Sequence, residues 1–340
     1  MYTGTTTNLP DQQQFTSKIQ KKILVEQQLT ERWLELEKNS NAFRYKLNVQ
    51  KQKTLDGKFN AIVQLNTERT SLRRKPQVIT SIVQPFDENV FNFKKVNECE
   101  ILLRCHDQLN AKSSAPHGIV TFLVNNSPLT KYHSLICPRV NENLSQIMNK
   151  ECIEFAIDLM TGLDDHGYRL GYNSLGAFAS VNHLHLHLIH VPEKLYLEDA
   201  EIIEMSDNVF KIEFPTFAMC MPVFHWTDRE AVANKFMKII TYFCEKSIPH
   251  NIFITHGRHR DTNLVKIFIF PRSSMSDKHV ASFNIAFCEL VGYVPVGDVD
   301  VYENLTEDFL LDKISTAIGP IDRQAIEADI LKLISNDIID

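Results

Sequence analysis

Hydrophobic and polar positions alternate along this chain with two different periods. In four stretches the apolar residues recur every three or four positions, as they do along one side of an α-helix. Elsewhere, short runs rich in Val, Ile, Leu and Phe lie between turn-forming residues, which is typical of β-strands. The first pattern predicts helices over residues 15–36, 142–163, 227–246 (with Thr227 as its N-cap) and 322–335. The second predicts strands at "GIVTFLVNN", "HSLICPRV", "YRLGYNS", "HLHLHLIHV", "NIFITHGR" and "LVKIFIFPR".

The spacing of these elements indicates the fold class. Several adjacent strands are joined by links too short for the crossover that parallel strands require. The order strand, strand, helix, strand, strand also returns loosely in the second part of the chain. We therefore expect an α/β (α+β) fold with a mainly antiparallel sheet, flanking helices and two related halves. The expected divisions are a flexible N-terminus (1–14), a catalytic half (15–195) and a degenerate second half ending in a helix (196–340).

Three histidines, His183, His185 and His187, are separated by single leucines. In a strand they would share one face, while the leucines on the other face could be buried. Three purely structural core histidines are the less favoured interpretation, because each buried imidazole needs hydrogen-bond partners. The functional alternatives are a zinc site and a phosphate site at which an imidazole attacks phosphorus. The preceding "NSLGAFASVN", rich in small and amide residues, favours a turn that approaches an anion.

Composition narrows the class of protein further. The 340 residues include 36 Lys and Arg against 42 Asp and Glu, a formal charge of −6, which argues against a general nucleic-acid binder. The seven cysteines form no C-x-x-C pair and lie mostly in apolar runs, as in proteins of reducing compartments. No stretch approaches about 18 uninterrupted apolar residues, and the start lacks a signal-peptide pattern. We expect a cytoplasmic protein with no membrane or nucleic-acid partner.

Longer segments around the histidines resemble a known family. The run from His183 to Ile189 fits the His-φ-His-φ-His-φ-φ signature (φ is apolar) and resembles the histidine triad superfamily, as does "NNSPLTKYHSLICPRV" upstream. "QPFDENVFNFKKV" and "RLGYNSLGAFASVNHLHLH" are similar to its GDP-hexose phosphorylase branch, which acts on GDP-glucose in animals and GDP-L-galactose in plants. This resemblance implies transfer of GMP from GDP-glucose to inorganic phosphate through a covalent GMP-histidine intermediate. The expected products are GDP and glucose 1-phosphate.

The resemblance also implies roles for individual residues. His185, the middle histidine, is the expected nucleophile, since a neutral imidazole is available near pH 7. His183 would brace it through the backbone, and His187 would hydrogen-bond to the leaving phosphate. The residues expected at the phosphates are Asn182, Ser174, Gly176 and His133, and those expected at the nucleotide are Asn66, Arg69 and Lys94. Neither a metal nor a cofactor is expected.

Two positions depart from the family pattern and leave alternatives open. His187 is at a place where related nucleotidyltransferases carry Gln and hydrolases carry His, so a GDP-sugar or nucleotide hydrolase is one alternative. Tyr132 is at a place where the family usually has Gly, directly before His133. A GDP-L-galactose phosphorylase and a non-catalytic GDP-sugar binding protein are further alternatives. The sequence leaves the oligomeric state undecided.

Overall fold

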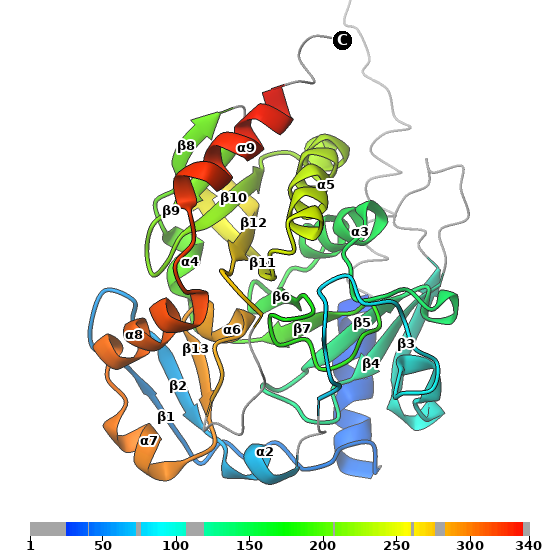
Figure 1. The fold of residues 1–340 in the computed structure, drawn as a ribbon. Coiled ribbons are helices and arrows are strands. Elements are labelled where there is room, and N and C mark those ends of the chain that lie inside the picture. The colour runs from blue at the N-terminus through cyan, green and yellow to red at the C-terminus, as the bar shows by residue number, and fades with distance from the viewer. Residues whose placement is uncertain are drawn as a thin grey trace, which may run out of the picture.

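A ten-stranded sheet runs through the middle of the molecule (Figure 1). The computed structural model describes residues 25–39, 41–72, 76–106, 119–206, 208–259, 262–275 and 283–335, so the expected flexible segment 1–14 lies outside the described residues. In spatial order the strands are β3 (Ile101–His106), β4 (Ile119–Val124), β5 (Ser134–Pro138), β7 (Leu186–His190), β6 (Tyr168–Asn173), β11 (His250–His259), β12 (Thr262–Pro271), β10 (Ala218–Val223), β9 (Val209–Ile212) and β8 (Ile203–Ser206). All neighbouring pairs are antiparallel, which confirms the predicted fold class.

Each half of this sheet has the same topology. Read from the outer edge inward, the first half has the order β3-β4-β5-β7-β6 and the second half β8-β9-β10-β12-β11. In both halves a helix lies between the third and fourth strands along the chain: α3 (Lys150–Met160) and α5 (Arg229–Glu245). The halves meet where β6 pairs with β11, and Asn173 is opposite Asn251 there. The strand order thus confirms two related halves in one chain.

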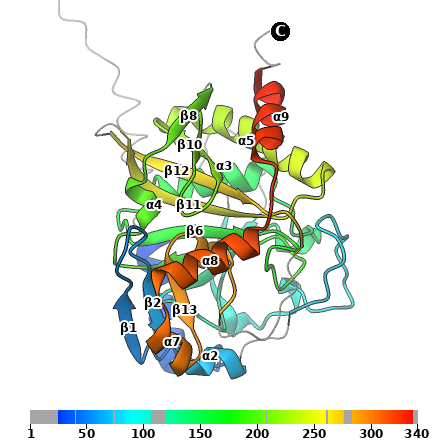
Figure 2. The same cartoon turned by 60° about the vertical axis from the view of Figure 1, so that its left-hand side comes forward.

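A three-stranded sheet brings together segments that are far apart in the sequence. It contains β1 (Lys51–Thr54), β2 (Ile62–Leu65) and β13 (Tyr293–Val296), and β13 is parallel to β2. The short helices α2 (Thr67–Leu72) and α6 (Phe287–Leu290) flank these strands in sequence, and α7 (Val299–Asn304) and α8 (Glu307–Ile318) follow. Figure 2 shows α8 running between the small sheet and the large one.

Hydrophobic side chains pack on both faces of the large sheet. In one core, the helix at residues 25–39, α3, α5 and α9 (Arg323–Ser335) pack against one face of the sheet. In the other core, the small sheet and α8 pack against the opposite face. Leu184, Leu186 and Leu188 all belong to the first core. Burial of one leucine side chain is worth about 1.5–3 kcal/mol. The leucines between the three histidines therefore anchor that segment to the sheet.

Two of the predicted helices begin at later residues in the structure, and the predicted start of the first, at residue 15, lies outside the described residues. α3 begins at Lys150 rather than at residue 142, because the Asn149 side chain accepts a hydrogen bond from the Cys152 N–H and caps the helix there. α5 begins at Arg229, and Thr227 lies in the preceding 3₁₀ turn η4 (Trp226–Asp228). The final predicted helix is confirmed as α9. Within the described ranges, no helix has both the length and the apolar composition needed to cross a membrane.

Candidate active site

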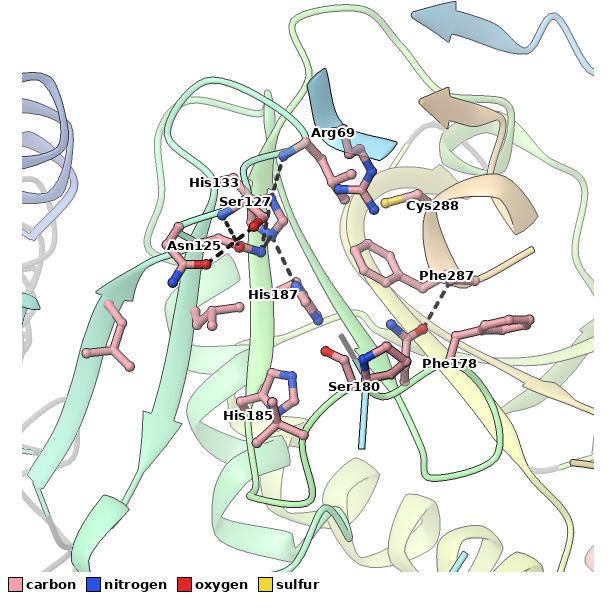
Figure 3. A pocket seen from close by; sticks show the side chains of 18 of the residues that line it. Arg69, Asn125, Ser127, His133, Phe178, Ser180, His185, His187, Phe287 and Cys288 are labelled. Atoms are coloured by element: carbon pink, nitrogen blue, oxygen red, sulfur yellow. Dashed lines mark hydrogen bonds between the residues drawn. The ribbon is translucent and has the colours of Figure 1, made fainter. Parts of the chain in front are cut away.

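The three histidines lie at the start of β7, in the first half of the sheet. His187 is in β7, whereas His183 and His185 come directly before it. His185 and His187 line a pocket, with their ring centroids 5.1 Å apart (Figure 3). The His183 ring packs instead against the rings of Phe86 and Phe93. Two of the three imidazoles therefore reach the pocket, and the third lies behind them.

Hydrogen bonds around His185 define its tautomer. Its Nδ1 lies 2.7 Å from the backbone oxygen of His183, and a carbonyl oxygen only accepts. In the neutral ring the proton is therefore on Nδ1, and Nε2 carries the lone pair. Gln146 holds the backbone here, because its Oε1 accepts from the His185 N–H (2.8 Å) and its Nε2 donates to the His185 oxygen (3.1 Å). The result is a fixed imidazole in the tautomer that a nucleophile requires.

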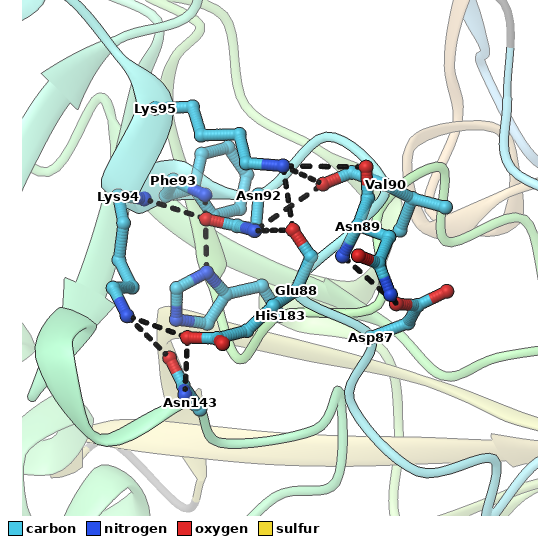
Figure 4. Close-up of polar contacts among 10 residues, drawn as sticks. All are labelled: Asp87, Glu88, Asn89, Val90, Asn92, Phe93, Lys94, Lys95, Asn143 and His183. Carbon is cyan, nitrogen blue, oxygen red and sulfur yellow. Dashed lines mark hydrogen bonds and ion pairs between the residues drawn. The ribbon is translucent and has the colours of Figure 1, made fainter.

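His183 is a buried, uncharged support for this arrangement. Its Nδ1 accepts a hydrogen bond of 3.0 Å from the backbone N–H of Phe93, in the short 3₁₀ helix η1 (Phe93–Lys95) (Figure 4). Burial lowers the pKa of His183 to about 4. The ring is therefore neutral at physiological pH, and its contribution to the pocket is the backbone oxygen that His185 uses.

A second pair of histidines sets the tautomer of His187. The backbone N–H of Leu129 donates to His133 Nδ1 (2.9 Å), so the proton of neutral His133 is on Nε2. This Nε2 is 3.1 Å from both His187 Nδ1 and Asn125 Nδ2. An amide nitrogen only donates, so His187 Nδ1 is the acceptor. The proton of neutral His187 is consequently on Nε2, the ring nitrogen farther from His133.

His133 is suited to this role by its surroundings. Burial, and next the positive charge of Arg69, lowers its pKa to about 3, so that it stays neutral. Tyr132, the departure from Gly noted above, keeps a left-handed backbone with φ of 61°. Its ring packs edge-on against Trp33, with the centroids 5.6 Å apart. The large side chain is thus accommodated in the core beside the first helix.

Asn173 and Ser180, two polar residues of the pocket lining, lie in the turn that indicated an anion site but are not among the residues expected at the phosphates. The Asn173 Oδ1 accepts hydrogen bonds from Asn251 Nδ2 (2.6 Å) and from the backbone N–H of Phe287 (3.1 Å). Its oxygen is therefore engaged, and Nδ2 remains as the donor toward the pocket. Both residues belong to the segment "NSLGAFASVN" that indicated an anion site, but their residue types alone did not distinguish them from turn residues.

Three of the residues predicted at the phosphates lie outside the pocket lining, whereas His133 lies within it. The Asn182 side chain accepts from the Gln146 N–H and donates to two backbone oxygens of residues 84 and 85. The Ser174 Oγ accepts from the His250 N–H (2.9 Å). Gly176 has φ of 75°, which favours glycine. All three contribute to the shape of the loop that carries Ser180.

The residues predicted at the nucleotide are separated by the structure. Arg69 lines the pocket. Lys94 does not, and its Nζ is 3.0 Å from a carboxylate oxygen of Glu88 (Figure 4). Asn66 is buried beside β13, where its backbone N–H donates to the Val296 oxygen (2.8 Å). Of these residues, only Arg69 is placed to contact a ligand in this pocket.

An apolar cluster and a polar group lie in different parts of the pocket. The apolar cluster includes Phe91, Phe93, Val96, Leu123, Leu135 and Val181, and the rings of Phe178, Phe283 and Phe287 line the pocket outside it. The Phe93 ring centroid is 5.0 Å from that of His185. Figure 3 shows Arg69, Asn125 and Ser127 grouped with His133 on the far side of His187 from His185. A ligand with an apolar ring at one end and anionic groups beyond it would match this distribution.

Comparisons with known proteins identify structures and families that are similar to this chain. The structure of yeast Ap4A phosphorylase Apa2 in complex with Ap4A superposes with a TM-score of 0.58 at 17% identity, over 87% of this chain and 97% of that one. This likeness shows that the two chains share a fold, which in this chain is one antiparallel sheet built from two related halves.

Family models make the assignment more specific. "GDPGP1-like, N-terminal domain" matches residues 24–189, and "GDPGP1-like, C-terminal domain" matches residues 201–330. The chain belongs to the GDPGP1-like family. Similar relatives are GDP-D-glucose phosphorylase 1 of Danio rerio (32% identical, 86% of each chain) and of Caenorhabditis elegans (34%, 86% of this chain and 64% of that one). GDP-L-galactose phosphorylase 2 of Arabidopsis thaliana is 27% identical over 78% of this chain and 66% of its own length.

Proposed function

We propose that this protein is a GDP-D-glucose phosphorylase, which transfers GMP from GDP-glucose to inorganic phosphate. The names of its animal relatives support this substrate. The observation that carries the proposal is the contact between His185 Nδ1 and the His183 oxygen, because it fixes the Nε2 lone pair of a residue that lines the pocket.

The reaction has two displacements at one phosphorus. In the first, His185 Nε2 attacks the α-phosphorus, a P–N bond forms, and the bond to the bridging oxygen breaks. Glucose 1-phosphate leaves with that electron pair, and the Nε2–H of His187 donates a hydrogen bond to the departing oxygen. In the second, an oxygen of inorganic phosphate attacks, the P–N bond breaks, and its electron pair returns to His185. GDP is the second product.

The two ends of the pocket orient the substrate. The guanine ring lies against Phe91 and Phe93 at the apolar end. The amide of Asn173 and the hydroxyl of Ser180 donate to the oxygens of the α-phosphate. Asn182, Ser174 and Gly176 act on the phosphate indirectly, through the shape of the loop between β6 and β7.

The test is an incubation of the protein with GDP-glucose, with and without inorganic phosphate, in which GDP and GMP are resolved. Phosphate-dependent GDP formation is expected, with loss of about 10⁴-fold or more in His185→Asn. His190→Asn is the matched control, because His190 is in the same strand, outside the pocket lining, and bonded to Asp165 (2.8 Å). A fully active His185→Asn variant would exclude the proposal.

Hydrolysis is the second candidate, favoured by the proton on His187 Nε2, which a water-dependent reaction can also use. It predicts GMP at the same rate whether or not phosphate is present. A comparison of kcat/KM for GDP-glucose and GDP-L-galactose distinguishes the two hexoses.

We also propose a cytoplasmic location. Cys137, Cys152, Cys220 and Cys288 are buried as free thiols, as expected in a reducing compartment. Imaging of the tagged protein in cells checks this, and retention in a secretory compartment would contradict it.

A further inference from the structure

We infer that Arg69 forms a subsite for the second phosphate: it binds the sugar-bearing phosphate of the substrate, then the attacking inorganic phosphate, and so favours phosphorolysis over hydrolysis. This inference rests on the proposed function. It assigns to one side chain the choice between two acceptors, phosphate and water.

Arg69 is the cation of the pocket. Among the described lining residues it is the sole lysine or arginine, and it is half-buried. No ion pair joins it to a carboxylate within the described ranges. A guanidinium has five donors in a planar fork that matches a phosphate. Without an ion pair in the described part of the chain, this half-buried guanidinium is available to an anion in the pocket.

Two carboxylates in the same lining accept hydrogen bonds from groups other than Arg69. Glu289 accepts a hydrogen bond from the Ala286 N–H (2.8 Å), and burial raises its pKa to about 7, so part of the population is neutral at physiological pH. Glu100 accepts hydrogen bonds from the backbone N–H of Asn97 (3.1 Å) and from Asn126. When Glu289 is neutral, its side chain leaves the positive charge of Arg69 uncompensated.

The position of Arg69 matches the order of groups in a GDP-sugar. Guanine at the apolar end and the α-phosphorus at His185 leave the second phosphate on the side of His187. Arg69 lies on that side: its charge is close enough to lower the pKa of His133, which is 3.1 Å from His187 (Figure 3). Its guanidinium is drawn next to Cys288, across the pocket from His185 (Figure 3).

One subsite serves both halves of the reaction. Glucose 1-phosphate departs from the side of the phosphorus opposite His185. In the second step His185 is the leaving group, so the attacking phosphate must approach the phosphorus from that same opposite side. Inorganic phosphate therefore enters the place that glucose 1-phosphate has left. Because a phosphate anion is repelled by the anionic GMP-histidine, it needs a cation there, whereas a neutral water does not.

The test isolates the second displacement. Loading the protein with guanosine 5′-phosphorimidazolide, a GMP donor without a second phosphate, makes the intermediate independently of Arg69. Inorganic phosphate is then added, and the GDP-to-GMP ratio of the discharged product is measured for wild type, Arg69→Gln and Arg69→Lys. Arg323→Gln is the control, since Arg323, the first residue of α9, is exposed and forms an ion pair with Glu213.

The ratio should fall by about 10²-fold in Arg69→Gln, with an intermediate value in Arg69→Lys and no change in Arg323→Gln. The rate of hydrolysis without phosphate should change little. An unchanged ratio in Arg69→Gln would overturn the assignment of Arg69 and leave the proposed function intact. Failure of the wild-type intermediate to yield GDP would overturn the proposed function itself.

Discussion

We expect His133 to act on the proposed reaction without contacting the reacting phosphorus, because its hydrogen bond sets which nitrogen of neutral His187 carries the proton. His133→Ala removes both the acceptor for Leu129 and the donor to His187. We expect kcat to fall by about 10²-fold while KM for GDP-glucose changes little. His133→Asn, whose amide can accept and donate, should recover part of the rate. Steady-state kinetics check this, and equal kcat values for His133→Ala and wild type would contradict it.

At the scale of single residues, the sequence was informative where the pattern was unusual. Histidines alternating with leucines indicated both His185 and His187, since few structural roles require that spacing. Asn173 and Ser180 were counted with the turn but not assigned to the phosphates, because Asn and Ser are ordinary turn residues. The direction of the Asn173 amide depends on Asn251, which belongs to the other half of the chain.

At the scale of elements, Asn149 determines where α3 starts. Its Oδ1 accepts from the Cys152 N–H at 2.9 Å, and α3 packs in the core against α5. Asn149→Ala should lower the free energy of unfolding by about 1 kcal/mol. Asn149→Asp, which keeps an acceptor, should restore most of it. Urea denaturation measures both, and activity should be retained in each variant. No change in stability on Asn149→Ala would refute this capping role.

Element types were easier to predict than element ends. The apolar periodicity of α3 and α5 is set by the face each helix buries, and this is visible in the sequence. The ends depend on single capping contacts, and many Asn, Ser and Thr residues in the chain can make them. Residues 142–149 have apolar positions like those of a helix, yet the cap at Asn149 begins the helix after them.

At the scale of the whole molecule, the second half positions a residue of the first. Asn251, in β11, donates to Asn173 and accepts from Arg272 Nε (2.7 Å). Asn251→Asp keeps the acceptor for Arg272 and removes the donor to Asn173 and to the backbone oxygen of Ala177. We expect kcat/KM for GDP-glucose to fall by about 10-fold, since one hydrogen bond is worth about 0.5–1.5 kcal/mol. Thr255→Ala, in the same strand, is the control, and equal values for both variants would contradict this role.

The two related halves were predictable, because each carries its own periodic pattern. The small sheet was not. Its parallel pair, β2 and β13, joins segments with no local signal for each other, and only this pairing brings Arg69 near Cys288. Long-range pairing of this kind depends on the whole three-dimensional fold.

The same pairing has a consequence for biosynthesis. A ribosome makes Ile62 long before Tyr293, its partner in the parallel pair. At about 5–20 residues per second, the earlier strand waits roughly 10–50 s. The histidines at the start of β7 are made well within that interval, so a nascent chain carries His185 before it contains Cys288, the residue beside Arg69. The pocket is therefore completed only late in translation. Chains that stop before β13 carry the histidines without the complete pocket.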